Sequence, residues 1–135
     1  MPVPLRMTLA AVAVLGLSSC GAGNPSAAVR AKIEQFATAT RERDYTTICD
    51  QVLAPALVAH LSAAGVTCEQ AWQLGLGAVS DPTLSIGQIK IKGSSASVIV
   101  LALARNQTAA LDTIGLVKTG GGWRILSLST PAGAQ

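Results

Sequence analysis

The chain has 135 residues, half of them hydrophobic, with 10 Lys and Arg against 7 Asp and Glu and a net charge of +3. This charge is too small to indicate a nucleic-acid partner, and the four aromatic residues provide no platform for stacking bases. We therefore expect one compact domain that does not bind nucleic acid.

The first 19 residues have the pattern of an export signal. A short leader with one positive side chain, Arg6, precedes an apolar run of about eleven residues at 7–17. A helix needs about 20 apolar residues to cross the hydrocarbon layer of a bilayer. The run therefore favours a cleaved signal over a stable membrane span.

The segment that ends this run, Leu-Ser-Ser-Cys-Gly at residues 17–21, resembles the lipobox of bacterial lipoproteins. In such proteins a diacylglyceryl group is attached to the cysteine, and the signal is cut just before it. The resemblance implies that Cys20 is lipidated and begins the mature protein, followed by a short tether at residues 20–25. Two acyl chains are enough for stable anchoring. An ordinary secretory signal cut elsewhere and an uncleaved anchor are the alternatives.

The two other cysteines, Cys49 and Cys68, form an even pair in a chain that we expect to enter an oxidising compartment. We therefore predict a disulfide between them. A metal site would need two more ligands, for which the sequence offers only His60 as a good one, and a redox pair is usually closer in sequence. We expect no metal and no cofactor.

The first half of the domain has helical periodicity. Ser26 is predicted to cap a helix at residues 26–43, whose apolar face has Val29, Ile33 and Phe36 in phase with Thr40 at the i, i+4, i+7, i+11 spacing. The opposite face of this helix is charged. We therefore expect an amphipathic helix that lies on an apolar surface.

Three shorter helices are predicted to follow. Asp44 is the expected N-cap of the second helix, and Pro55 suits the first turn of the third. Thr67 and Gln70 have the spacing of a capping box, which opens a fourth helix that closes at Gly75 or Gly77. Cys49 would then lie in the second helix and Cys68 in the first turn of the fourth.

After residue 82 the pattern becomes that of strands separated by short turns. Four strands are predicted, at residues 84–92, 96–104, 108–118 and 123–129, with a bulge near Gly87. Short turns between consecutive strands indicate an antiparallel meander. Helices followed by such a sheet define an α+β class, and residues 131–135 form a tail.

This order of elements resembles the nuclear transport factor 2-like superfamily, which includes SnoaL-like proteins and ketosteroid isomerases. The features that match are the long first helix, the acidic break at Asp44, the short helices up to Leu61, and the strand series that ends in Gly-Trp-Arg-Ile at 122–125. Small exported actinobacterial lipoproteins of this superfamily have a cysteine pair placed like Cys49 and Cys68. The resemblance implies N-terminal helices packed on a curved four-stranded antiparallel sheet, a cone with an apolar pocket, over residues 26–130.

Enzymes of this superfamily use carboxylates, tyrosines or histidines of the pocket as acid and base. The candidates here are Asp112, Tyr45 and His60. Asp112 would act as a base if its strand face is the concave one, whereas a solvated carboxylate near the edge or end of the sheet is the simpler interpretation. His60 is expected on the exposed side of a helix, and Tyr45 in the core with its hydroxyl in water. None of these residues has an assured counterpart in the isomerase pattern.

Two further features bear on binding. Trp72 and Trp123 could line a ligand pocket, although a place in the core is the simpler interpretation of each. The second predicted strand is apolar on both faces, so both faces must be covered. This pattern predicts a homodimer through the sheet.

We therefore expect a lipoprotein anchored on the extracytoplasmic face of the cell membrane. Its domain is expected to be non-enzymatic and to bind a small apolar ligand or an envelope partner protein. A small SnoaL-like or isomerase-like enzyme that uses Asp112 and Tyr45 is the alternative, and a structural or sensory domain with a filled core is a third. An enzyme needs at least two polar groups that converge on one cavity.

Overall fold

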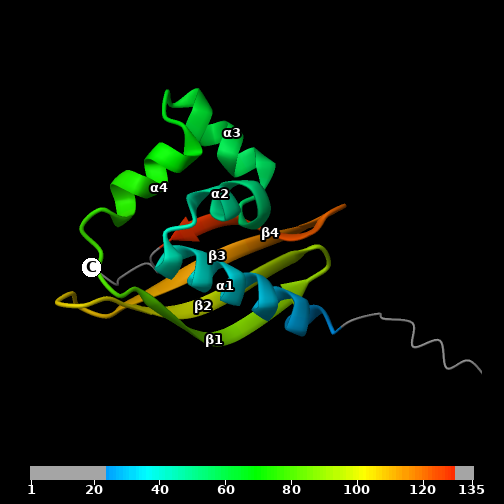
Figure 1. Cartoon of the computed structure of the whole chain (residues 1–135). Coiled ribbons are helices and arrows are strands. Elements are labelled where there is room, and N and C mark those ends of the chain that lie inside the picture. Colours follow the sequence, from blue (N-terminus) through cyan, green and yellow to red (C-terminus); the bar gives the residue numbers. More distant parts are fainter. Residues whose placement is uncertain (1–23, 130–135) are drawn as a thin grey trace, which may run out of the picture.

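The computed structural model describes residues 24–129, so the predicted signal peptide, Cys20 and the tail lie outside the described residues. Helices come first and strands follow (Figure 1). The helical elements are α1 (Pro25–Glu42), α2 (Tyr45–Thr47), the π-helical turn η1 (Ile48–Val52), α3 (Pro55–Ala63) and α4 (Cys68–Leu76). The strands are β1 (Thr83–Lys92), β2 (Ser95–Leu103), β3 (Ala110–Thr119) and β4 (Gly122–Ser129). The α+β prediction is confirmed.

The N-cap of helix α1 lies two residues earlier than predicted. Asn24, not Ser26, is its N-cap, and the Asn24 side chain accepts a hydrogen bond of 3.0 Å from the backbone N–H of Ser26. Pro25 occupies the first turn, where its missing N–H leaves no donor unsatisfied and its fixed φ suits the helix. The predicted apolar face is confirmed, because Val29, Ile33, Phe36 and Thr40 are all buried.

Asp44 caps the next helix as predicted, and its carboxylate accepts hydrogen bonds from the Thr47 hydroxyl at 2.7 Å and the Thr47 N–H at 3.1 Å. These two bonds, the hydroxyl bond first, lower the pKa of Asp44. The single short helix that the sequence predicts here is instead two elements, the three-residue α2 and the wider η1. In η1 the N–H of Leu53 donates to the carbonyl of Ile48 at 2.9 Å. This wide turn buries three apolar side chains and delivers Leu53 to a parallel bridge with Ile125.

Helices α3 and α4 form as predicted, with Pro55 at the first turn of α3 and a complete Thr67–Gln70 capping box at the start of α4. Neither helix packs deeply on the rest of the domain. Among their residues, Cys68 is the only one whose side chain is fully buried. Leu57, Val58 and Leu61 of α3 and Trp72 of α4 are half-buried and pack against the core, so other contacts must help to fix these helices.

The sheet has the order β1-β2-β3-β4, with antiparallel pairing throughout and the predicted bulge between Ile86 and Ile89. Strand β3 begins at Ala110, two residues later than predicted. The preceding segment bonds to the loop between α4 and β1 instead of extending the strand. The N–H of Arg105 donates to the carbonyl of Ser80 at 2.9 Å, and the Gln107 side chain donates to the carbonyl of Ala78 at 3.4 Å.

The core lies between α1 and the face of the sheet that α1 crosses, which we call the inner face (Figure 1). Apolar residues alternate along the strands and pair across them, as Val98 does with Ile114 and Leu116 with Ile125. The largest fully buried side chains are Val29, Ile33, Ile48, Val52, Leu53, Val98, Val100, Ile114 and Ile125. The apolar positions of β1 lie on the same face and pack against this cluster.

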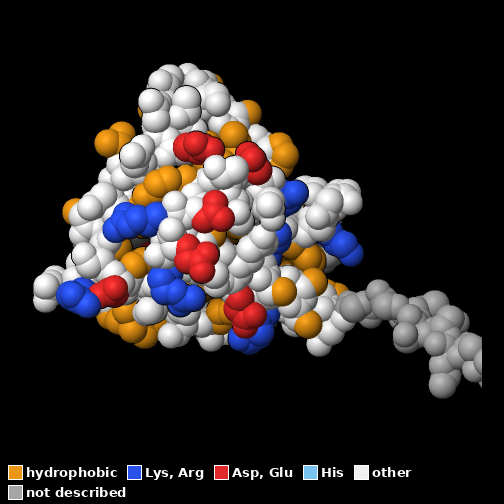
Figure 2. Space-filling model, viewed as in Figure 1, with side chains coloured by type: hydrophobic (Ala, Val, Ile, Leu, Met, Phe, Trp, Pro, Cys, Tyr) orange, Lys and Arg blue, Asp and Glu red, His pale blue; other side chains and the backbone are white. Residues whose placement is uncertain are grey.

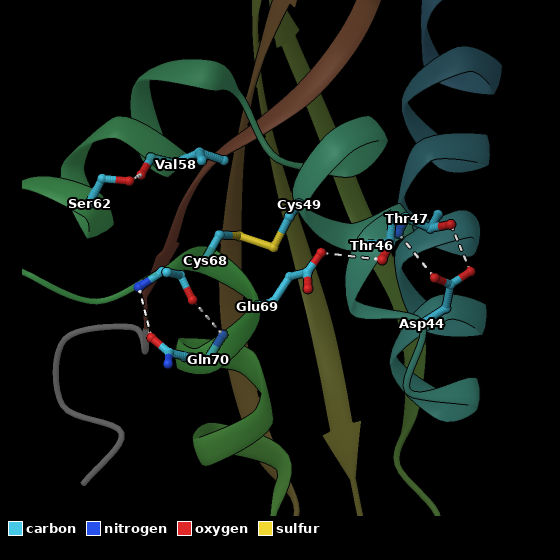
Figure 3. Close-up of a disulfide and its surroundings, with 10 residues drawn as sticks. Asp44, Thr46, Thr47, Cys49, Val58, Ser62, Cys68, Glu69 and Gln70 are labelled. Carbon is cyan, nitrogen blue, oxygen red and sulfur yellow. Dashed lines mark hydrogen bonds between the residues drawn. A yellow bond between two sulfur atoms is a disulfide. The ribbon is translucent and has the colours of Figure 1, made fainter.

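Cys49 and Cys68 form a disulfide, with Cα atoms 6.0 Å apart, that joins η1 to the first turn of α4 (Figure 3). A second contact supports this connection, because the hydroxyl of Thr46 donates a hydrogen bond of 3.2 Å to the carboxylate of Glu69 (Figure 3). The start of α4 is therefore fixed covalently to the element that packs against α1.

We predict that the C49A/C68A variant loses about 3 kcal/mol of unfolding free energy, because the unfolded chain regains the entropy of an open loop. Urea denaturation followed by circular dichroism would measure this loss. The native chain under dithiothreitol should lose a similar amount, and the variant should not respond to the reductant. Equal stability of native and variant chains would contradict a stabilising role for the disulfide.

Candidate ligand-binding pocket

A cavity of about 450 Å³ lies between α1, α4 and one end of the inner face of the sheet. Sites for small molecules commonly have about 300–1,000 Å³. Most of the side chains in the wall are apolar. They include Phe36 and Ala37 of α1, Trp72 and Leu76 of α4, and Leu84, Val100, Ala102, Ala110, Ile114 and Leu128 of the sheet.

The two helices of the wall meet through an aromatic contact. The rings of Phe36 and Trp72 pack edge to face, with centroids 5.4 Å apart and planes at 74°. Trp72 is half-buried and lines the cavity, whereas Trp123 is 5% exposed and belongs to the core, outside the residues that line the cavity. Of the two tryptophans considered for ligand binding, the structure therefore places only Trp72 at this pocket.

Two polar side chains of the wall bear on its chemistry. Asp112 lies on the inner face of β3, opposite Val100 of β2, and is half-buried rather than solvated at the edge of the sheet. It is the only titratable side chain among the described residues that line the cavity. Thr40 of α1 is 8% exposed, and its hydroxyl oxygen is buried with no hydrogen-bond partner in residues 24–129.

The structure does not bring the other acid and base candidates to this cavity. His60 is exposed on α3, and Tyr45 accepts a long hydrogen bond of 3.5 Å from the guanidinium of Arg43. Neither residue lines the pocket that contains Asp112. The cluster of three catalytic groups considered from the sequence is therefore not assembled here.

Arg43 fixes the far end of α4, a role that sequence reasoning missed. It follows α1 in a left-handed conformation (φ 56°), which costs a residue other than glycine about 1–2 kcal/mol. Its guanidinium donates hydrogen bonds to the carbonyls of Leu76 at 2.8 Å and Val79 at 2.6 Å. These contacts explain why an arginine stands where glycine is the usual choice.

The polar groups of the described part of the chain include possible metal ligands and one lysine whose pKa is shifted. Within residues 24–129, no group of three or more His, Cys, Asp or Glu could hold a metal ion. Burial, and then the charge of Arg124, lower the pKa of Lys32, but Lys32 bonds to Gln35 and Gln51 and does not line the cavity. The wall of the pocket is therefore mainly apolar, with the carboxylate of Asp112 and the hydroxyl of Thr40, and with further polar side chains at exposed positions, Thr83, Gln107 and Thr108.

The opposite face of the sheet, which we call the outer face, carries apolar side chains in contact with solvent. Ile99 is 37% exposed and Leu111 is 51% exposed, and Leu111 pairs with the half-buried Leu101. This is the apolar second face that the sequence predicted for β2. The homodimer through the sheet stays a prediction.

No protein-family model and no curated protein matches this sequence. Solved structures do match the fold. The Kfla4162 protein of Kribbella flavida has a TM-score of 0.58 and 17% identity, over 78% of this chain and 88% of that protein.

Two other matching structures carry the name of NTF2-like proteins of unknown function. The protein from Shewanella baltica has a TM-score of 0.56 and 15% identity, over 76% of this chain and 89% of its own. The protein from Silicibacter pomeroyi has a TM-score of 0.55 and 17% identity, over 76% and 91%. The chain therefore has the NTF2-like fold that the order of its elements predicted.

We predict that Thr40→Val keeps or raises the unfolding free energy, by up to about 1 kcal/mol, because it removes a buried hydroxyl that has no partner. Thermal unfolding would measure the change. Thr38→Val, at an exposed position of the same helix, controls for the change in helix propensity. A loss above about 1 kcal/mol specific to Thr40→Val would show that the hydroxyl makes a stabilising bond.

Proposed function

We propose that this chain is a membrane-anchored extracytoplasmic lipoprotein whose domain binds a small, mainly apolar molecule. The observation that carries the proposal is the cavity of about 450 Å³ between α1, α4 and the inner face of the sheet. A filled core, the third interpretation of the sequence, would leave no such space. Empty apolar volume forgoes packing contacts, so a cavity of this size favours a domain that receives a ligand.

Two features support an extracytoplasmic location at the membrane. The lipobox-like segment at residues 17–21 precedes α1 by only a few residues, which would place the start of α1 near the membrane surface. The disulfide between Cys49 and Cys68 suits an oxidising environment outside the cytoplasm. None of the helices within residues 24–129 is long and apolar enough to cross a bilayer. The lipid on Cys20 would therefore be what holds the domain at the membrane.

The wall defines the chemistry of the ligand. Phe36 and Trp72 provide flat apolar surface, and the small side chains of Ala37, Ala102 and Ala110 leave room beside them. The carboxylate of Asp112 can accept several hydrogen bonds, so it can receive one from a hydroxyl or amine of the ligand. A mainly apolar molecule with one such donor fits this wall.

An enzyme of the SnoaL or isomerase type is less well supported. General acid and base catalysis needs a proton donor and a proton acceptor within reach of one substrate. Asp112 is the only titratable side chain of the described wall, and Tyr45 and His60 lie elsewhere. The exposed apolar residues of the outer face favour an envelope partner protein or a second copy as a separate function of that surface.

We predict that native mass spectrometry of the protein purified from its own membrane shows a retained small molecule. Ala102→Phe should reduce retention more than tenfold, because the added ring fills the cavity that the ligand would occupy. Ala56→Phe, at an exposed position of α3 outside the pocket, makes the same change of side chain and should retain the ligand. Equal retention by both variants would place the ligand elsewhere.

We also predict that intact-mass analysis of the membrane-purified chain finds Cys20 at the N-terminus with a diacylglyceryl group. Cys20→Ser should remove the site of lipidation and block the cleavage that depends on it. An unmodified Cys20 that is still preceded by the leader would refute the lipoprotein assignment, whereas ligand binding by the pocket would still be decided by the retention experiment.

A further inference from the structure

A second hollow, of about 310 Å³, adjoins the ligand pocket. Its lining residues are Arg41, Arg43, Ser80, Asp81, Pro82 and Arg105, which we call the arginine hollow. Pro82 lines both cavities, and its neighbours Val79 and Thr83 line the pocket. The two spaces therefore meet along the loop that joins α4 to β1.

The arginine hollow is positively charged, with three guanidinium groups and one carboxylate. Arg105 pairs with Asp81 in an exposed ion pair, and Arg43 is engaged with the carbonyls of Leu76 and Val79. The side chain of Arg41 is exposed and makes no hydrogen bond or ion pair within residues 24–129. In Figure 2 basic side chains lie around the C-terminal end of α1 and the adjoining turn between β2 and β3.

The dipole of α1 accounts for only part of this cluster. Basic side chains at the C-terminal end of a helix interact favourably with its dipole, which would suit Arg41 and Arg43. Arg105 comes from the turn between β2 and β3, far away in sequence. The hydrogen bond of its N–H to the carbonyl of Ser80 fixes that turn against the loop shared by the two cavities. The convergence of these arginines therefore depends on the tertiary fold.

We propose that the ligand is an anionic amphiphile, whose apolar chain lies in the pocket and whose carboxylate or phosphate group lies in the arginine hollow. This inference rests on the proposed function, because it requires the pocket to receive a ligand. Arginine binds both carboxylate and phosphate groups through two parallel N–H donors. The orientation follows from the two linings, because the wall of the pocket is mainly apolar and the hollow has three arginines.

The test uses the full chain with Cys20→Ser, so that no acyl chain of its own competes for the pocket. The probes are octyl phosphate, octanol and inorganic phosphate, titrated at low salt while the tryptophan indole resonances are followed by NMR. Trp72 lines the pocket and Trp123 is in the core, so the two resonances provide a signal and an internal control. Octyl phosphate should shift the Trp72 resonance and bind about tenfold more tightly than octanol.

The variant R41Q/R105Q should lose this tenfold preference and keep its affinity for octanol. The control K90Q/K92Q removes the same charge from exposed positions on the outer side of β1 and should keep the preference. Of the three arginines of the hollow, Arg43 is left intact because its side chain holds the end of α4. An unchanged Trp123 resonance would show that each variant is folded.

Three results would overturn the inference. Equal affinity for octanol and octyl phosphate would leave the proposed function intact and would show that the hollow does not recognise an anionic head group. Binding of inorganic phosphate as tightly as octyl phosphate, without a shift of Trp72, would identify a site for free anions. If neither octyl probe shifts Trp72, the pocket does not take such ligands and the proposed function fails as well.

Discussion

The placement of α4 depends on connections at its two ends. Cys68 is the only buried residue of α3 and α4, and their other apolar side chains that pack against the core are only half-buried. At one end the disulfide to Cys49 fixes the first turn of α4 to η1. At the other end the guanidinium of Arg43 donates to the carbonyl of Leu76, the last residue of the helix, and to that of Val79. Between these ends, Trp72 contacts Phe36 of α1.

The cavity follows from this arrangement. A helix packed by its own apolar face would approach the sheet until side chains filled the space, because protein interiors are close-packed. Helix α4 is instead held at its ends, and the small side chains of Ala37, Ala102 and Ala110 do not fill the space beneath Trp72. Arg43 connects this space to α1, since its backbone ends that helix while its side chain fixes α4. The left-handed strain at Arg43 is therefore offset by contacts that shape the pocket wall.

The sequence was most informative where local chemistry decides the structure. The caps at Asp44 and Thr67 and the apolar face of α1 depend on neighbouring residues, and each was predicted. The order of elements also predicted the NTF2-like fold. The π-helical turn was not predictable, because it depends on Leu53 reaching Ile125. The late start of β3 and the roles of Arg43 and Arg105 also arise from bonds to the loop after α4. The N-cap of α1 is an exception among these local features, because the sequence predicted Ser26 and the structure has Asn24.

The charges around the pocket differ in how strongly they select a ligand. Two unit charges 4 Å apart interact by about 1 kcal/mol in water and about 4 kcal/mol in surroundings of intermediate polarity. Asp112 is half-buried in the wall, whereas Arg41 and Arg105 are exposed. The attraction of a negative group to either exposed arginine is therefore near the smaller figure, whereas moving that group into the mainly apolar wall costs its desolvation. This desolvation cost sets the direction in which an anionic amphiphile would bind, and the arginines of the hollow add affinity.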